Sequence, residues 1–133
     1  MSLNKLFTYG TLCSGFENPT AVALHKKSIF LGAAQTQGRL YLINQSYPGL
    51  LQNELDTTIV KGELWELLNP VATLQELDEY EGCAKNSTQP FEYQRVVVKA
   101  EMNNVAIKAW AYLYRLPVIP SQEITSGDFK QSH

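Results

Sequence analysis

The apolar residues of this chain fall mostly into short runs of strand-favouring residues separated by glycine, proline and asparagine, which predicts a mainly β protein. In the run from residue 28 to residue 43, we expect Gly32 and Gly38 to separate two strands or to bend one strand through a bulge. Asn103-Asn104 joins the last two runs into a hairpin, because asparagine tolerates the positive φ of a tight turn. The expected strands span residues 5–9, 28–43, 57–67, 91–102 and 105–116.

Two further segments are predicted to be helices. Asn18 can cap a short helix that ends near residue 25, with Pro19 in its first turn. A longer helix is predicted to begin at Pro70, after a cap at Asn69, and to run to residue 81, where Gly82 ends it.

Strands with one or two helices in this order predict an α+β fold, in which a small mixed sheet curls toward a β-barrel. The Pro-Gly pair within Tyr47-Pro48-Gly49-Leu50 predicts a turn. The chain of 133 residues contains no internal repeat, low-complexity tract or linker. Because that length suits one hydrophobic core, we expect a single domain over residues 1–133.

One residue breaks the amphipathic pattern of the longer helix. At about 100° per residue, Val71, Leu74 and Leu77 form the apolar face, and Glu81 falls between the two leucines. Partial burial and the negative end of the helix dipole should both raise the pKa of Glu81. A glutamate tuned in this way can carry protons near neutral pH. Asp78 leans toward the same face, and we expect it to have a structural role.

Other interpretations of Glu81 stay open from the sequence alone. Its side chain can reach solvent from a frayed helix end, or it can pair with Lys85 or Arg95. His25, near the end of the shorter helix, is interpreted as a solvated or helix-terminal histidine.

The first strand runs into a loop bracketed by Gly10 and Gly15. Glycine gives the backbone the freedom to aim several N–H groups into one concave space. Carboxylates and developing oxyanions bind well to such a cluster of donors. The same pattern is also typical of a plain turn, so the loop indicates a binding site only in combination with other residues.

Composition narrows the partners and the compartment. The formal net charge of −2 gives no basic surface field, which argues against nucleic acid and acidic membranes as partners. No apolar run approaches the length of about 20 residues that spans a bilayer, and the first residues lack a signal-peptide pattern, so we expect a soluble cytoplasmic protein. Cys13 and Cys83 lack the spacing of a metal site or a disulfide framework, and we expect both to be reduced.

A series of short motifs is spread over nearly the whole chain: Phe7-Thr8-Tyr9-Gly10-Thr11-Leu12, Tyr47-Pro48-Gly49-Leu50, Val60-Lys61-Gly62-Glu63-Leu64-Trp65, Leu77-Asp78-Glu79-Tyr80-Glu81-Gly82, Tyr93-Gln94-Arg95, Ala109-Trp110-Ala111-Tyr112 and Ser126-Gly127-Asp128-Phe129. In this order they resemble the γ-glutamylcyclotransferase-like family, in particular its AIG2-like and γ-glutamylamine cyclotransferase branch. The chain departs from many relatives after Leu12, where Cys13-Ser14-Gly15 replaces an arginine or another polar residue.

The resemblance implies a compact mixed β-barrel with short peripheral helices and a cavity in which the Tyr-Gly-Thr-Leu loop faces Glu81. It implies an enzyme of acyl-transfer or lyase type, which releases 5-oxoproline and a free amine or amino acid from a small-molecule γ-glutamyl substrate. The α-amine of the substrate attacks its own γ-carbonyl, with Glu81 acting as general base and then general acid. We expect no cofactor and no metal ligand.

The substrate-binding residues expected from the resemblance are Tyr9, Gly10, Thr11, Leu12 and Tyr93. The backbone N–H groups of residues 10–12 would hold the α-carboxylate of the substrate or its carbonyl oxygen as that atom gains charge. The two tyrosines would orient the substrate or the catalytic glutamate, although both also suit the wall of a barrel.

Two other classes of function stay open. The same cavity could hold an amino acid or amine without turnover, or it could be vestigial in a protein that interacts with other proteins. Thiol chemistry at Cys13 or Cys83 is disfavoured because neither has a histidine nearby in the sequence. We expect a monomer or a weak homodimer.

Overall fold

The computed structural model describes residues 3–53, 55–85 and 87–130. Its elements are β1 (Lys5–Thr8), α1 (Pro19–Lys26), β2 (Ser28–Gln37), β3 (Arg39–Ile43), β4 (Tyr47–Leu51), β5 (Ile59–Leu67), α2 (Pro70–Tyr80), β6 (Tyr93–Met102), β7 (Val105–Tyr114) and a 3-10 turn, η1 (Pro120–Gln122). Seven strands form one sheet in the order β1-β5-β2-β6-β7-β4-β3. An additional parallel pairing of β1 with β7 closes the first five of these strands into a mixed barrel.

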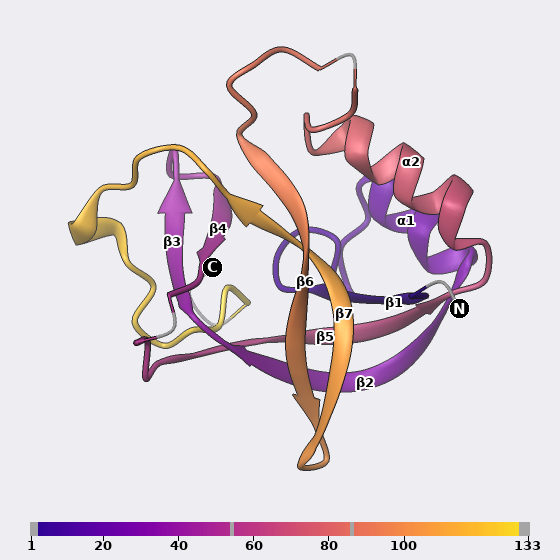
Figure 1. Ribbon diagram of the computed structural model, residues 1–133, viewed down its shortest axis with the longest axis horizontal. Coiled ribbons are helices and arrows are strands. Elements are labelled where there is room, and N and C mark those ends of the chain that lie inside the picture. The colour runs from indigo at the N-terminus through magenta and orange to yellow at the C-terminus, as the bar shows by residue number, and fades with distance from the viewer. Residues whose placement is uncertain (1–2, 54, 86, 131–133) are drawn as a thin grey trace.

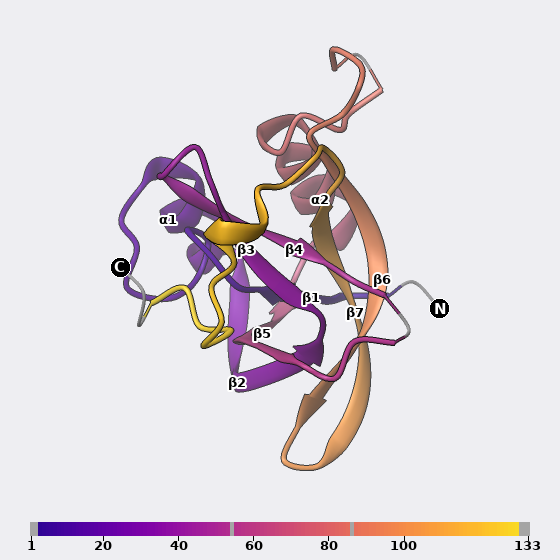
Figure 2. The ribbon, with the colours of Figure 1, turned by 90° about the vertical axis from the view of Figure 1, so that its left-hand side faces the viewer.

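The helices lie together at one end of the barrel, where α1 and α2 contact each other (Figure 1). The β6–β7 hairpin crosses in front of β2 and β5 in this view. Figure 2 brings β3, β4 and the C-terminal segment to the front, where the two strands extend the sheet beyond β7. The predicted α+β barrel with short peripheral helices is therefore confirmed.

The predicted β-hairpin is also confirmed. β6 and β7 pair antiparallel from Tyr93 opposite Tyr114 to Met102 opposite Val105. Asn103 and Asn104 have φ of 54° and 64°. Positive φ at both central residues is what a type I′ turn requires, so the asparagine pair sets the register of this hairpin.

The segment predicted to be a turn, residues 47–50, instead belongs to β4, and that prediction is wrong. The chain reverses earlier, at Asn44 and Gln45, which have φ of 51° and 57°. Gly49 is required inside the strand for a different reason: a Cβ there would lie 2.8 Å from Cβ of Tyr114 on β7. The Pro-Gly pair thus permits close packing of strands, and local turn rules do not detect it.

The buried face of α2 is rotated relative to the prediction. Thr73, Leu74 and Leu77 are buried, whereas Val71 is 74% exposed. At about 100° per residue, Val71 falls outside a face centred on these three side chains, while Glu81 falls inside it. The sequence pattern misplaced the start of the face but identified the residue that interrupts it.

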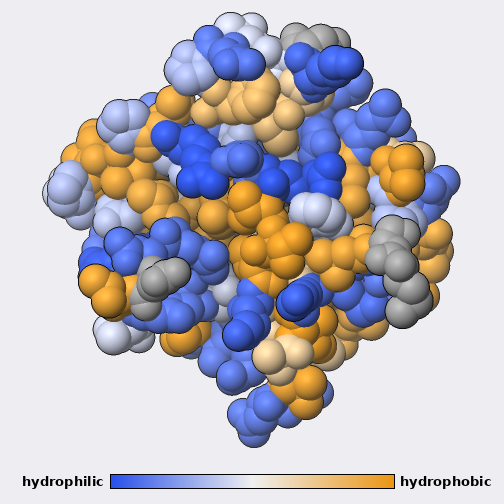
Figure 3. All heavy atoms as spheres, in the orientation of Figure 1, coloured by the Kyte–Doolittle hydropathy of each residue, from blue (hydrophilic) through white to orange (hydrophobic). Residues whose placement is uncertain are grey.

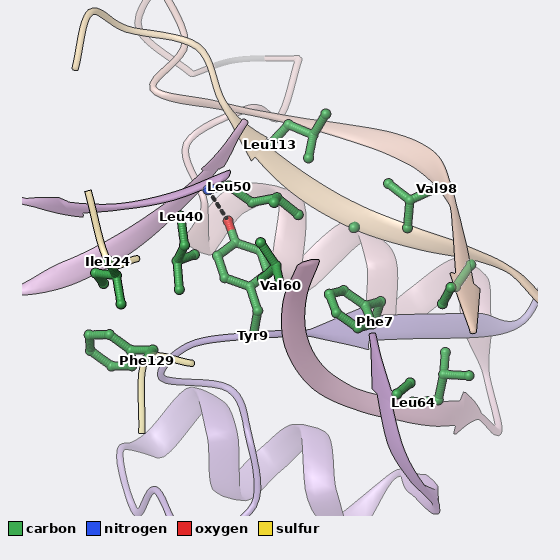
Figure 4. Close-up of a cluster of buried hydrophobic side chains, with 14 residues drawn as sticks. Phe7, Tyr9, Leu40, Leu50, Val60, Leu64, Val98, Leu113, Ile124 and Phe129 are labelled. Atoms are coloured by element: carbon green, nitrogen blue, oxygen red, sulfur yellow. Dashed lines mark hydrogen bonds between the residues drawn. The ribbon is translucent and has the colours of Figure 1, made fainter. Parts of the chain in front are cut away.

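The buried side chains form two groups that share β1. Phe7 points into the barrel with Val60 and Leu64, and Phe129 of the C-terminal segment closes that group (Figure 4). Leu6, the preceding residue, packs in the second group, which lies between the barrel and the helices. Successive side chains of β1 point to opposite faces, so this short strand contributes both to the barrel core and to the core beneath α1 and α2.

The surface is mixed in character. Hydrophobic residues gather near the middle of the face shown in Figure 3. On the β6–β7 hairpin, Val97 and Val105 are 48% and 58% exposed. Among the described residues, no helix is both long enough and apolar enough to cross a membrane.

Candidate active site

A cavity of about 490 Å³ lies among the end of β1, the start of β4, the C-terminal end of α2 and the start of β6. The residues predicted to form the site all line it: Tyr9, Gly10, Thr11, Leu12, Glu81 and Tyr93. The other described lining residues are Leu6, Phe7, Thr8, Asn18, Ser46, Tyr47, Pro48, Tyr80, Glu92 and Tyr112. The fold therefore collects these side chains from six separate stretches of sequence.

In the loop after β1, the backbone carbonyl oxygens of residues 10–12 are hydrogen-bonded, whereas their N–H groups are not bonded to any described residue. Each carbonyl oxygen of residues 10–12 accepts a hydrogen bond: Gly10 from the Cys13 N–H at 3.0 Å, Thr11 from Nδ2 of Asn18 at 2.8 Å, and Leu12 from Nε2 of His25 at 2.8 Å. The N–H groups of residues 10–12 donate to no acceptor in the described part of the chain. Because buried N–H groups are normally paired, these three are available to an anionic group in the cavity.

Residues that the sequence left outside the site hold this loop in place. Asn18 caps α1 through Oδ1, which accepts from the Ala21 N–H at 2.9 Å, while its Nδ2 binds Thr11. His25 stacks on Trp65 with ring centroids 4.4 Å apart and planes 2° apart. The prediction of a helix-terminal His25 is confirmed, and this histidine also anchors the loop through Leu12.

Close packing against β4 also constrains the loop. A Cβ on Gly10 would lie 2.6 Å from Cγ of Pro48, so the backbone can approach β4 this closely only with glycine at this position. Pro48 in turn accepts a hydrogen bond on its carbonyl oxygen from the Tyr93 hydroxyl at 2.7 Å. The loop, β4 and β6 are thereby held together around the cavity.

The end of the loop is fixed by a buried acid on β5. Glu63, 8% exposed, accepts hydrogen bonds from the Ser14 N–H at 2.6 Å, the Ser14 hydroxyl at 2.5 Å and Nζ of Lys130 at 2.9 Å. Burial opposes ionisation of Glu63, but the hydrogen bonds from Ser14 and Lys130 outweigh it and lower the pKa of this carboxyl. Ser14 is therefore part of an anchor for the loop.

Glu81 is the residue immediately after the last turn of α2. Gly82, with φ of 73°, reverses the chain there: its N–H donates to the Glu79 carbonyl at 3.2 Å, and the Cys83 N–H donates to the Asp78 carbonyl at 2.9 Å. This pair of bonds is a Schellman motif, which fixes the helix end. The frayed end considered from the sequence is therefore not what the structure shows.

The Glu81 carboxyl has no hydrogen-bond or ion-pair partner among the described residues. Burial, and secondarily the charge of Glu92, raise the pKa of Glu81 to about 7. Such a group is divided between its acid and its carboxylate form at neutral pH, which is the property of a proton carrier.

Asp78, the competing acid one turn earlier, is fully engaged. Its oxygens accept from Arg95 Nε at 2.8 Å, from a second Arg95 nitrogen at 3.2 Å and from the Tyr112 hydroxyl at 2.7 Å. Arg95 also stacks over Trp110, with Cζ 4.3 Å from the ring centroid. Arg95 therefore pairs with Asp78 and not with Glu81, and Asp78 ties α2 to β6 and β7.

The two predicted tyrosines are neighbours of Glu81 whose hydroxyls are already bonded. Tyr9 donates to the Tyr112 carbonyl at 2.6 Å and accepts from the Leu50 N–H at 3.2 Å (Figure 4). Burial raises the pKa of both Tyr9 and Tyr93, and the charge of Glu81 acts in the same direction. Both phenols are thus neutral donors that shape the cavity wall.

The sequence did not indicate Glu92, the second acidic residue that lines the cavity. It accepts a hydrogen bond from the Tyr47 hydroxyl, and its charge contributes to the raised pKa of Glu81. No local pattern of the sequence signals this position, because successive side chains along a strand point to opposite faces.

The two thiols are poor nucleophiles in this structure. Burial raises the pKa of Cys13 to about 12 and that of Cys83 to about 11. A thiol that stays protonated at neutral pH reacts slowly.

Comparison with known proteins gives one match by sequence and several by structure. The sequence model of the family described as "Gamma-glutamyl cyclotransferase, AIG2-like" matches residues 6–131. No curated protein matches the chain.

Among solved structures, c4763, a uropathogenic E. coli-specific protein, superposes with a TM-score of 0.72 and 25% identity over 99% of this chain and 96% of that one. An AIG2-like protein from Mus musculus gives a TM-score of 0.67 and 23% identity, over 92% and 83% of the two chains. YkqA from Bacillus subtilis gives 0.73 and 24% over 98% of this chain, which spans only 40% of YkqA.

Proposed function

The chain belongs to the AIG2-like gamma-glutamyl cyclotransferase family, and on that basis we propose that it converts a small γ-glutamyl amide to 5-oxoproline and a free amine. The observation that carries the proposal is the unpaired, partly buried Glu81 carboxyl, which shares one cavity with the unused N–H groups of residues 10–12. A carboxyl that can take and return a proton, opposite donors that can stabilise an oxyanion, is the set that this cyclisation needs.

The reaction requires the α-ammonium of the substrate to lose a proton before its nitrogen can attack. An α-amino group has a pKa of about 8, and Glu81 has a pKa of about 7. Proton transfer to Glu81 is then uphill by about one pKa unit, or about 1.4 kcal/mol, which is small beside a chemical barrier. A carboxyl with the ordinary glutamate pKa would make the same transfer several kcal/mol uphill.

The atoms balance without water or a cofactor. The α-nitrogen forms a bond to the γ-carbonyl carbon, and the oxygen of that carbonyl becomes an oxyanion. Glu81 then returns its proton to the leaving nitrogen as the C–N bond breaks. It takes the second proton that the ring nitrogen must lose and passes it to the departing amine or to solvent, so that 5-oxoproline and the amine separate. The side chain ends the cycle as it began, as a carboxylate.

The loop after β1 supports two parts of this reaction. Its free N–H groups would bind the α-carboxylate of the substrate or the developing oxyanion, and one such donor is typically worth about 3 kcal/mol of barrier. Tyr9 and Tyr93, which line the cavity, would hold the glutamyl chain folded and so bring the α-nitrogen near the γ-carbon.

The test is detection of 5-oxoproline by mass spectrometry after incubation with a panel of γ-glutamyl amines and amino acids. Glu81→Gln should lower the rate by a factor of about 100 or more, because the amide keeps the shape but cannot carry the proton. Glu79→Gln, an exposed neighbour on the same helix, is the matched control and should keep wild-type activity. Equal activity of Glu81→Gln and wild type would refute the mechanism, and saturable binding of a γ-glutamyl compound without product would indicate a binding protein.

A further inference from the structure

We propose, on the basis of the proposed function, that Glu92 selects substrates whose leaving amine carries a second, positively charged group, such as the γ-glutamyl derivative of a diamine. The inference goes beyond the cyclisation itself, because it concerns the part of the substrate that is released. It rests on the charges that line the cavity and on how Glu92 is held.

The cavity wall has acidic side chains and no basic ones. Glu81 and Glu92 both line it, and none of its described lining residues is a lysine, arginine or histidine. The nearest arginine in sequence to the lining residues of β6, Arg95, is committed to Asp78. A leaving group with a carboxylate would find no cation here, whereas a leaving group with an ammonium would meet a carboxylate.

Glu92 is oriented by its neighbours and keeps one oxygen available. The Tyr47 hydroxyl donates to Oε2, and Nδ2 of Asn44 donates to the Tyr47 hydroxyl at 3.4 Å. Oε1 accepts no hydrogen bond from any residue that the structure describes. A fixed carboxylate with a free oxygen can bind an ammonium group without first paying for its own orientation.

Aromatic rings flank this carboxylate. The rings of Tyr47 and Tyr93 lie with centroids 6.3 Å apart and planes at 45°, and Tyr93 packs edge-on against Tyr114 at 5.3 Å. Ring faces attract ammonium groups and exclude water from the ion pair. Together with Glu92, these rings form a small subsite that can bind a cation.

The α-ammonium of the glutamyl group does not fill this role. It must deliver its proton to Glu81, so it lies against that carboxyl during the reaction. Glu92 has no hydrogen bond to Glu81 and acts on it only through its charge. Its free oxygen is therefore left for a different part of the substrate, and the leaving amine is the remaining part.

The experiment compares kcat/KM for three γ-glutamyl amides that differ in one terminal group: those of 1,4-diaminobutane, n-pentylamine and 4-aminobutanoic acid. Their ends are cationic, neutral and anionic at similar length. Wild type should prefer the cationic substrate over the neutral one about tenfold or more, and should use the anionic one least. In Glu92→Gln the cationic and neutral substrates should differ by less than about twofold.

Glu79→Gln serves again as control and should keep the wild-type preference. Tyr47→Phe, which removes the hydroxyl that orients Glu92 and keeps the ring, should lose part of the preference and provides a second test if Glu92→Gln does not fold. Equal use of the cationic and neutral substrates by wild type, or a preference that survives in Glu92→Gln, would overturn the proposal.

If no substrate is turned over, the proposed function fails, and the same compounds still test the subsite by calorimetric binding. Tighter binding of the diamine derivative by wild type, lost in Glu92→Gln, would support the cation-binding subsite in a binding protein. Equal binding of the cationic and neutral compounds would overturn it.

Discussion

Replacing Glu81 by glutamine should make the protein more stable at alkaline pH while it abolishes turnover. The pKa of Glu81 is raised from 4.5 to about 7 in the folded protein. The folded state therefore binds this proton more tightly than the unfolded chain does. Glu81 costs the fold nothing well below pH 4.5, and the cost grows as the pH rises to 7 and is constant above it.

The size of the effect follows from the same pKa values. At pH 8 the ionised Glu81 costs about 3 kcal/mol, and at pH 5 it costs about 1 kcal/mol. Glutamine never ionises, so the stability of Glu81→Gln minus that of wild type should rise by about 2 to 3 kcal/mol between these two pH values. Any fixed cost of burying an amide is the same at both pH values and cancels in this difference.

Urea denaturation of both proteins at pH 5 and pH 8 measures the effect directly, with Glu79→Gln as the control that should follow wild type. A difference between Glu81→Gln and wild type that stays constant over this range would mean that Glu81 is not a buried carboxyl of raised pKa. The reasoning about proton transfer would then lose its support, whatever the activity of the variant.

Two further predictions concern residues that support the site. Asp78→Asn should lower the free energy of unfolding by about 2 kcal/mol in urea denaturation, because Arg95 and Tyr112 lose a charged acceptor; an inactive variant of unchanged stability would instead indicate that Asp78 is the catalytic acid. Glu63→Gln should lower kcat/KM by about tenfold through loosening of the loop at Ser14. Because the pKa of Glu63 is lowered by folding, its stabilisation is present above the ordinary glutamate pKa and lost as the pH falls, so the stability difference between this variant and wild type should be larger at pH 7 than at pH 3.

The features that the sequence predicted correctly depend on local rules. The Asn103-Asn104 turn needs only positive φ at two adjacent residues, and the helix cap of Asn18 and the stop at Gly82 involve neighbours within a few positions. Glu81 was found because a carboxylate on an apolar helix face conflicts with the pattern of its own helix. Each of these signals is complete within about one dozen residues.

The features that the sequence missed depend on contacts between distant segments. Residues 47–50 form a strand only because β7 pairs with them on one side and β3 on the other. Glu92 is in the cavity because β6 begins beside Tyr47, and no local pattern places those two residues together. The anchor between Ser14 and Glu63 joins residues 49 positions apart. Register and barrel closure decide such contacts, and a one-dimensional pattern does not contain them.

The two acids of the cavity connect substrate recognition to proton transfer. Burial is the larger of the two causes that raise the pKa of Glu81, and the charge of Glu92 is the second. A leaving group whose cation pairs with Glu92 offsets the second cause, so the pKa of Glu81 falls when such a substrate is bound. More of Glu81 is then ionised and ready to accept the proton of the α-ammonium, but the carboxylate is also a weaker base, and the two effects oppose each other. Selection by Glu92 should therefore act mainly through binding of the leaving group, as a lower KM with little change in kcat.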